Sequence, residues 1–412
     1  MSAVRAGTSY RAVLSRPRVL RLFLPATAGR LAYGILPLAL FFTVAQATGS
    51  LGSAGLTAAA LNLTVVLGGP GRARLVDRFG RRVLPALAGL YAVSTVLLVW
   101  AASAHAPTPI LLAAAALVGA CPPPLGPTMR TVWADLMPEG PLRLRALSLD
   151  AVVEEVLFTA GPLITGVAIA VADPRMALAL ALLLMVLGSA VFGFGPATSR
   201  TPTIADAADT PAETGAGLLR SPGFRPMLFT LAGLFAALGL VDVAVPVTAA
   251  NAGTPASAGW LMAGMSAGSA VGGLLFGRRT WATPFARLLP RAALALAALV
   301  AGLILLSPLW ALAVGLIVTG LLLSPGLIMA YALADELAPA GARTRASVWV
   351  NTAGNAGITT GTALAGALAD HVPAQLLYAV AALVLLGTAT LPGRRLARTA
   401  DPGIAPPAVA TS

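Results

Sequence analysis

Apolar stretches of about 20 residues alternate along the chain with short polar junctions. A stretch of that length spans a bilayer as one α-helix, so the pattern predicts an all-α membrane protein with twelve transmembrane helices. We expect the spans at Leu22–Val44, Ala54–Pro70, Val83–Ala104, Pro109–Val132, Leu147–Ala172, Met176–Phe194, Met227–Ala250, Ala256–Phe276, Arg291–Leu306, Leu309–Ala332, Ser347–Leu368 and Ala374–Leu391.

The arginines are distributed unevenly between the two sides of this topology. Both chain ends and every even-numbered junction carry them, whereas the odd-numbered junctions hold only Arg175 and the first span holds Arg30. Cytoplasmic loops carry the positive excess. We therefore expect a multi-pass protein of the bacterial plasma membrane, with both termini cytoplasmic and with His105 and His371 on the outer side.

Composition excludes several other classes of protein. The chain is 58% hydrophobic and only 10% charged, against roughly 25% charged residues in soluble domains. Its net charge of +12 is spread along span ends and forms no single patch, so no nucleic-acid partner is expected. The single cysteine, Cys121, supports neither a disulfide nor a metal site. No phosphate-binding loop is present, and we expect no cofactor and no enzymatic activity.

The two halves of the chain are related to each other. A polar stretch separates six spans from six, which predicts a bundle at residues 1–198, a cytoplasmic linker at 199–219 and a second bundle at 220–412. A shift of 200 residues superposes Gly126, Met129, Ala134, Asp135, Arg143, Arg145, Ala146, Thr159, Gly161 and Gly166 on Gly326, Met329, Ala334, Asp335, Arg343, Arg345, Ala346, Thr359, Gly361 and Gly366. The repeat predicts two pseudo-symmetric six-helix bundles.

The second-to-third junction contains a recognisable motif. Residues 73–82 read Ala-Arg-Leu-Val-Asp-Arg-Phe-Gly-Arg-Arg and resemble the major facilitator superfamily (MFS) signature Gly-x-x-x-Asp-Arg-x-Gly-Arg-Arg, with Ala73 in place of the first glycine. The resemblance extends from about Arg18 to Arg395 and favours the twelve-span bacterial efflux permeases. It implies the MFS fold and a cytoplasmic gate motif formed by Asp77, Arg78, Gly80, Arg81, Arg82 and Asp135.

The fifth span carries a second, partial match. Its sequence Gly161-Pro162-Leu-Ile-Thr-Gly166 is similar to the glycine-rich signature of antiporters, although Leu157 and Thr165 replace two of its glycines. Glycine and proline at these positions permit close helix contact and a bend. The match supports export, and ordinary helix packing is the alternative interpretation.

Five ionisable side chains stand out inside the expected spans, where each costs roughly 2.5–3.5 kcal/mol on insertion scales. They are Arg30, Asp150, Glu154, Glu155 and Asp242. The first and fifth spans are neighbours in the resembled fold, and Arg30 and Glu154 lie at similar depth, so an ion pair of Arg30 with Glu154 or Glu155 is geometrically allowed. We interpret Glu154, Glu155, Asp150 and Arg30 as proton-coupling candidates, with Asp150 nearest the interface. The alternative is a static ion network at the inner gate.

Other polar residues are candidates for a substrate cavity. Aligning the two halves on Pro37 and Pro246 puts Asp242 opposite Tyr33, and in the resembled family the first and seventh spans line the central cavity. Asp242 is expected to bind a cationic substrate or a proton, or else to be a solvated residue at the outer mouth. Asn351 and Asn355 share one face of the eleventh span, where they line the cavity or bond between helices.

Together these features predict a proton-coupled exporter of a small amphipathic compound that works by alternating access between two bundles. The expected partners are the substrate, protons and the lipid bilayer, and the expected state is a monomer. An importer with the same fold is the first alternative. A transport-inactive membrane sensor or interaction protein is the alternative from a different class.

Overall fold

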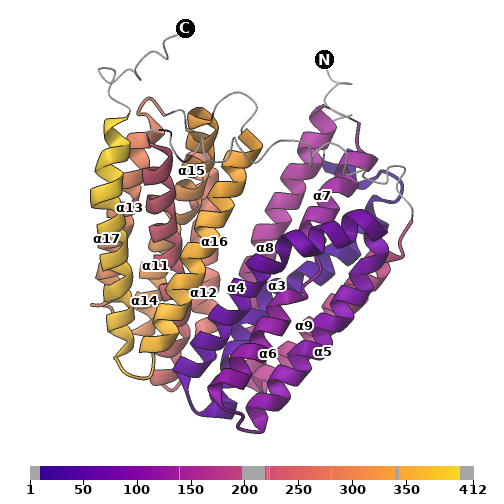
Figure 1. Cartoon of the computed structure of the whole chain (residues 1–412), viewed down its shortest axis with the longest axis horizontal. Helices are drawn as coiled ribbons and strands as arrows, with labels where there is room; N and C mark the ends of the chain where they lie inside the picture. Colours follow the sequence, from indigo (N-terminus) through magenta and orange to yellow (C-terminus); the bar gives the residue numbers. More distant parts are fainter. Residues whose placement is uncertain are drawn as a thin grey trace. The chain divides into compact units, whose positions relative to one another are not determined.

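The computed structural model describes residues 10–138, 140–196, 219, 221, 223–279, 281–338 and 343–399, and their regular elements are all helices (Figure 1). Of the expected linker 199–219, only the last residue lies within the described part. The helices are α2 (Tyr10–Leu14), α3 (Val19–Thr48), α4 (Leu51–Phe79), η1 (Gly80–Val83), α5 (Leu84–Ser103), α6 (Thr108–Ala120), α7 (Leu125–Leu136), α8 (Pro141–Val171), α9 (Pro174–Gly193), α11 (Phe224–Asn251), α12 (Ser257–Gly277), α13 (Phe285–Leu303), α14 (Leu309–Gly320), α15 (Leu323–Leu337), α16 (Arg343–Leu368) and α17 (Ala374–Arg398).

The helices agree with the expected all-α membrane fold. Among the described residues, 10 helical stretches are long and apolar enough to cross a membrane. This number treats α4 with α5, α6 with α7 and α14 with α15 as one stretch each, and it omits the more polar α16. Since α4 and α5 are separate helices joined by η1, the arrangement is consistent with twelve spans.

Some expected boundaries were wrong. The second span does not end at Pro70, because α4 continues through this proline to Phe79. The fourth span is not continuous: α6 and α7 are separated by residues 121–124. Three successive prolines there lack backbone N–H groups and clash with the preceding turn, which interrupts the helix. The fifth and ninth spans begin earlier than expected, at Pro141 and Phe285.

The chain forms two compact units. Unit 1 comprises Met1–Asp209 with Val245–Ser266 and Gly366–Asp370, and unit 2 comprises Thr210–Ala244, Ala267–Ala365 and His371–Ser412. The assignment of two whole six-helix bundles at 1–198 and 220–412 therefore stays a prediction.

Unit 1 is built around α3, which packs against α4, α5, α8 and α9. Glycines form its closest contacts. A Cβ on Gly188 of α9 would lie 2.6 Å from the backbone nitrogen of Gly29, and a Cβ on Gly161 of α8 would overlap the backbone of Gly34. Small residues let helix backbones approach closely in membranes, and here they place α8 directly against the middle of α3.

Unit 2 uses the same kind of packing. Gly239 of α11 lies against α16, where an added Cβ would be 2.9 Å from the backbone nitrogen of Thr362. A buried apolar cluster then joins α11, α13, α15, α16 and α17. Its members include Phe224, Leu289, Met329 and Leu396.

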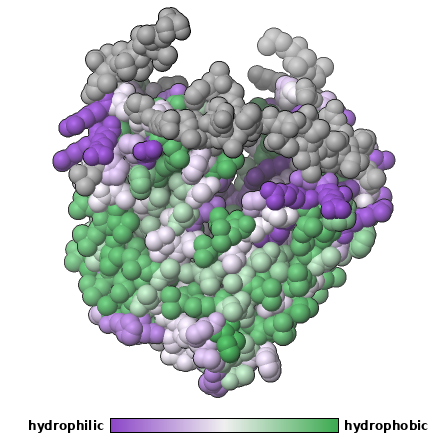
Figure 2. Space-filling view, viewed as in Figure 1, coloured by the Kyte–Doolittle hydropathy of each residue, from purple (hydrophilic) through white to green (hydrophobic). Residues whose placement is uncertain are grey.

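The outer surface of the helices is apolar. Large hydrophobic side chains such as Leu67, Val93, Trp100 and Trp310 are exposed. On the face in Figure 2, hydrophobic residues cover the middle stretches of the helices and hydrophilic residues gather near the helix ends. This distribution suits helices that are solvated by lipid.

Candidate functional site

Four charged side chains from three helices meet inside unit 1. Arg30 of α3 lies 2.6 Å from Asp150 and 3.1 Å from Glu154, which are both on α8. Arg130 of α7 lies 2.9 Å from Glu154 and 3.8 Å from Asp150. Two guanidinium groups and two carboxylates therefore form a neutral ion network. Because Asp150 and Glu154 are four residues apart, they lie on one face of α8 and both reach Arg30.

The four members differ in their contact with solvent. The side chains of Arg30 and Asp150 are 3% and 2% exposed, whereas those of Glu154 and Arg130 are 33% and 53% exposed. Arg30 Nη1 donates a hydrogen bond to Asp150 Oδ1, whereas the contact of its Nη2 with Glu154 is an ion pair without hydrogen-bond geometry. Arg30 and Asp150 are therefore buried, whereas Glu154 and Arg130 are partly accessible to solvent.

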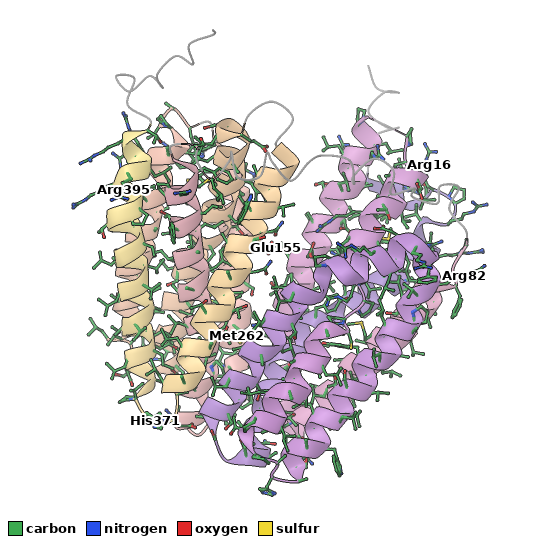
Figure 3. All side chains as sticks on the ribbon, in the orientation of Figure 1. Arg16, Arg82, Glu155, Met262, His371 and Arg395 are labelled. Carbon is green, nitrogen blue, oxygen red and sulfur yellow. The ribbon has the colours of Figure 1, made fainter. Side chains whose placement is uncertain are left out.

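The pair of Arg30 and Glu154 is present, but the positions of the neighbouring carboxylates Asp150 and Glu155 differ from those expected. Asp150, which we expected nearest the interface, is the most buried member, with a side chain that is 2% exposed and paired with Arg30 of α3. Glu155 is exposed and forms no ion pair in the described part of the chain, so the alternative pair with Arg30 is not formed. Glu155 is labelled on α8 in Figure 3.

A cavity of about 530 Å³ lies next to the network in unit 1. Arg30 and Glu154 line it, together with apolar residues of α3, α4 and α7 and with Tyr33, Arg72 and Asp77. Its size is that of a small-molecule site, for which roughly 300–1,000 Å³ is usual. The cavity therefore brings the solvent-accessible part of the ion network next to a space large enough for a small molecule.

The interrupted fourth span forms one wall of this cavity. Residues 122–124 line it directly. The Tyr33 hydroxyl donates a hydrogen bond to the carbonyl oxygen of Pro123. Arg72 of α4 donates to the carbonyl oxygens of Gly119 and Ala120, at 3.2 and 3.1 Å, at the end of α6. A guanidinium suits this position because the last carbonyls of a helix lack intrahelical donors and carry partial negative charge.

The gate motif lies at the junction of α4 and α5. Gly80 has φ 67°, a left-handed conformation that glycine adopts without steric cost, and the chain turns there into η1. Arg81 donates to the carbonyl oxygens of Phe192 and Pro196, at 3.3 and 2.7 Å. These carbonyls hold the guanidinium at the end of α9, and among the described residues Arg81 forms no ion pair with Asp135, the last expected member of the motif.

The other members of the motif make fewer contacts. The Arg78 guanidinium lies 5.3 Å from the Phe79 ring centroid, and Arg82 is exposed. Asp77 is half-buried and lines the cavity from the end of α4. Its role at the inner gate stays a prediction.

The antiporter-like motif of α8 is a packing surface. Gly161 lies against Gly34 of α3, and a Cβ on Gly166 would be 2.7 Å from the carbonyl oxygen of Ala256. Pro162 is buried between these two contacts. The geometry is that of close helix packing, and the link to export stays a prediction.

The remaining candidates lie in unit 2. Asp242 of α11 and Asn355 of α16 are half-buried, and Asn351 is exposed. In the part of the chain that the structure describes, Asp242 forms no ion pair. The interpretation of these residues and of Tyr33 as substrate contacts stays a prediction.

Sequence reasoning missed two members of the site. Arg72 and Arg130 were counted with the cytoplasmic loop arginines, whereas both lie within helices and contact other groups of unit 1. For Arg72 the sequence contains no such signal, because Gly68-Gly69-Pro70-Gly71 is typical of a turn, although α4 continues through it. For Arg130, the signal is its position after the run of three prolines, which places it on a new helix.

A bundle of apolar helices that surrounds a buried ion network and an adjoining cavity is the architecture of a multi-pass membrane transporter. The sequence model of the Major Facilitator Superfamily matches residues 22–277 and 227–408. The chain therefore belongs to this superfamily of membrane transporters. No protein with a curated description matches the chain in sequence.

Solved structures show the same fold. The crystal structure of the nucleoside transporter NupG is 12% identical, with a TM-score of 0.71 over 91% of this chain and 98% of NupG. The crystal structure of a mutant form of NupG is 10% identical, with a TM-score of 0.68 over 91% and 99%. A bacterial homologue of the iron transporter ferroportin, in an inward-facing state, is 12% identical, with a TM-score of 0.67 over 95% and 99%. At these identities the likeness shows the fold alone.

Proposed function

We propose that this transporter is a secondary active exporter that couples the outward movement of a small amphipathic compound to the inward movement of protons across a bacterial plasma membrane. Both termini would be cytoplasmic, and the substrate would cross by alternating access. The single observation that carries the proposal is the position of Glu154, a carboxylate that belongs to the ion network and also lines the cavity.

Glu154 suits reversible protonation better than its neighbours do. Its side chain is 33% exposed, so water in the cavity reaches it, whereas the Asp150 side chain is 2% exposed and is held at 2.6 Å by Arg30. When Glu154 takes up a proton, the network changes from neutral to a net charge of +1. The attraction of Glu154 for Arg30 and Arg130 is then lost, while Arg30 keeps Asp150 as its partner.

This change links proton binding to conformation. Arg130 and Glu154 connect α7 with α8, so protonation loosens the contact between these helices on the side of the cavity. A ligand shifts a conformational equilibrium only by its differential affinity for the two states. A proton that binds Glu154 from outside would favour the state that releases substrate outward, and its release inside would reset the network.

Two other functions remain in competition with this one. An importer would use the same proton site with the opposite order of substrate binding. A transport-inactive sensor would bind ligand without flux, and its ion network would be static. In that case Glu154 would hold helices together without titrating.

The test is accumulation of candidate compounds in cells that express the protein, with and without a proton uncoupler. We expect the protein to lower accumulation, the uncoupler to abolish this effect, and Glu154→Gln to behave like the uncoupled protein. Glu155→Gln is the matched control, because its carboxylate is adjacent in sequence but exposed and outside the network. Raised accumulation would indicate import, and equal effects of the two variants would contradict the role of Glu154.

A further inference from the structure

Both halves of the chain break the helix of the corresponding span near the same place, the first over four residues with three prolines and the second over a two-residue turn that keeps helical dihedrals. In the first half α6 ends at Ala120 and α7 begins at Leu125, and in the second half α14 ends at Gly320 and α15 begins at Leu323. These positions correspond under the 200-residue repeat. Interrupted helices at matching positions of two repeats are a mark of binding sites in transporters, because unwound backbone is tolerated in a membrane where it lines a cavity.

The second half closes its interruption with a glycine. Gly272 of α12 packs on the backbone of Leu321, and an added Cβ would lie 2.8 Å from the Leu321 Cα. One turn earlier, Gly268 packs in the same way on Ile317. Ser269 of α12 also forms a hydrogen bond of 2.7 Å with Ser324 of α15. Among the described residues no charged side chain hydrogen-bonds to this interruption.

The first half has an arginine where the second half has that glycine. Arg72 corresponds to Gly272, and its guanidinium fills the space beside Gly68, whose Cβ would lie 2.6 Å from Arg72 Nη1. Arg72 bonds the carbonyl oxygens of Gly119 and Ala120 and, at 2.6 Å, that of Val65. In the second half the backbone N–H of Leu322 donates to the carbonyl oxygen of Thr319 at 3.2 Å. The prolines of the first half have no N–H to donate, so Arg72 supplies the donors there and brings a positive charge that the second half lacks.

That charge has no counter-ion among the described residues. Arg72 is 8% exposed, its Nε has no hydrogen-bond partner, and it forms no ion pair with a carboxylate. The other lining carboxylates do not serve it: Glu154 is held by Arg30 and Arg130. Asp77 lies five residues after Arg72 on α4, which separates the two residues by about 7.5 Å along the helix axis at 1.5 Å per residue, and it forms no ion pair with Arg72.

The cavity beside Arg72 is otherwise mostly apolar. Its walls include Leu36, Leu61, Val65 and the prolines of the interruption. A buried cation in such surroundings favours a partner with negative charge, because a buried charge without a counter-ion is unfavourable. Apolar walls of this size suit the hydrocarbon part of the same molecule.

We propose that this cavity of unit 1 binds an amphipathic organic monoanion, with its carboxylate directed to Arg72 and its hydrocarbon part against the apolar wall. The inference rests on the proposed function, in that this ligand would be the transported compound. It narrows the substrate class from small amphipathic compounds to those that carry an acidic group.

The test is equilibrium binding to the purified full chain in phosphatidylcholine nanodiscs, with empty nanodiscs as the blank. The probes are radiolabelled 1-naphthoate and 4-phenylbutyrate, each compared with its neutral amide. We expect the wild type to bind the acids at least about tenfold more tightly than the amides, as the loss of a charge-assisted hydrogen bond would predict. In Arg72→Gln this preference should fall to within about twofold. Arg175→Gln, an exposed arginine far along the sequence, should retain it.

A second variant keeps the test decisive if Arg72→Gln does not fold. Leu61→Trp fills the cavity and leaves Arg72 in place, and it should weaken binding of both acids about tenfold or more. Equal affinity of the wild type for acids and amides, binding of neither, or unchanged acid binding in Leu61→Trp would overturn the proposal. The assay uses no proton gradient, so acid binding without proton-driven flux would contradict the proposed function alone.

Discussion

Arg30 and Asp150 form an ion pair of 2.6 Å in the interior of unit 1, and both side chains are at most 3% exposed. Removing one partner of a buried pair costs about 3–5 kcal/mol when no other counter-ion remains; here Glu154, 3.1 Å from Arg30, and Arg130, 3.8 Å from Asp150, offset part of that cost. We therefore expect Arg30→Met to lower the midpoint of thermal unfolding in detergent, and Asp150→Leu to do the same.

The double variant Arg30→Met with Asp150→Leu should recover most of that loss. A buried ion pair replaced by apolar residues of similar size is often neutral in stability, and Glu154 would keep Arg130 as its partner. Single variants with the unfolding midpoint of the wild type, or a double variant worse than both, would show that the pair is not a coupled unit.

A second prediction concerns the contact of α3 with α8. Gly161→Ala introduces a Cβ that overlaps the backbone of Gly34, and overpacking of this kind costs about 1–3 kcal/mol. Thermal unfolding should therefore begin at lower temperature. Gly89→Ala of α5 is the control, because its Cβ would meet no atom within 4 Å and alanine favours a helix. Equal midpoints for the two variants would mean that this contact is loose.

A third prediction concerns orientation. Within unit 2, His371 and Arg395 lie at opposite ends of α17 (Figure 3). Cysteines at His105 and His371, in a Cys121→Ala background, should react with impermeant thiol reagents in intact cells. A cysteine at Arg82 should react only after the cells are permeabilised. Labelling of Arg82 in intact cells would reverse the orientation inferred from the arginines.

The helical fold was predictable from the sequence because it depends mainly on the length and hydrophobicity of each separate stretch of the chain. Each apolar stretch must satisfy its backbone hydrogen bonds within itself in a bilayer, and this dictates helices of known length. The ends of the helices were less predictable. Pro70 does not end α4, since the helix continues past it, whereas the three prolines after Cys121 do interrupt the fourth span.

Only the part of the site formed by residues at equal distance from the same ends of neighbouring spans was predictable. The pair of Arg30 and Glu154 follows from spacing and from the neighbouring spans of the resembled fold. The participation of Arg130 does not, because its contact with Glu154 of α8 joins residues on two helices whose relative position the spacing along the chain does not give. Arg72 shows the same limitation, since its partners are carbonyl oxygens exposed by the interruption between α6 and α7.

The most direct test of proton coupling through Glu154 is substrate-induced proton movement in proteoliposomes that contain a pH-sensitive dye, with the compound identified by the accumulation assay as substrate. The wild type and Glu155→Gln should move protons opposite to the substrate. Glu154→Gln should still exchange labelled for unlabelled substrate but move no protons. Proton movement at the wild-type rate in Glu154→Gln would contradict the account.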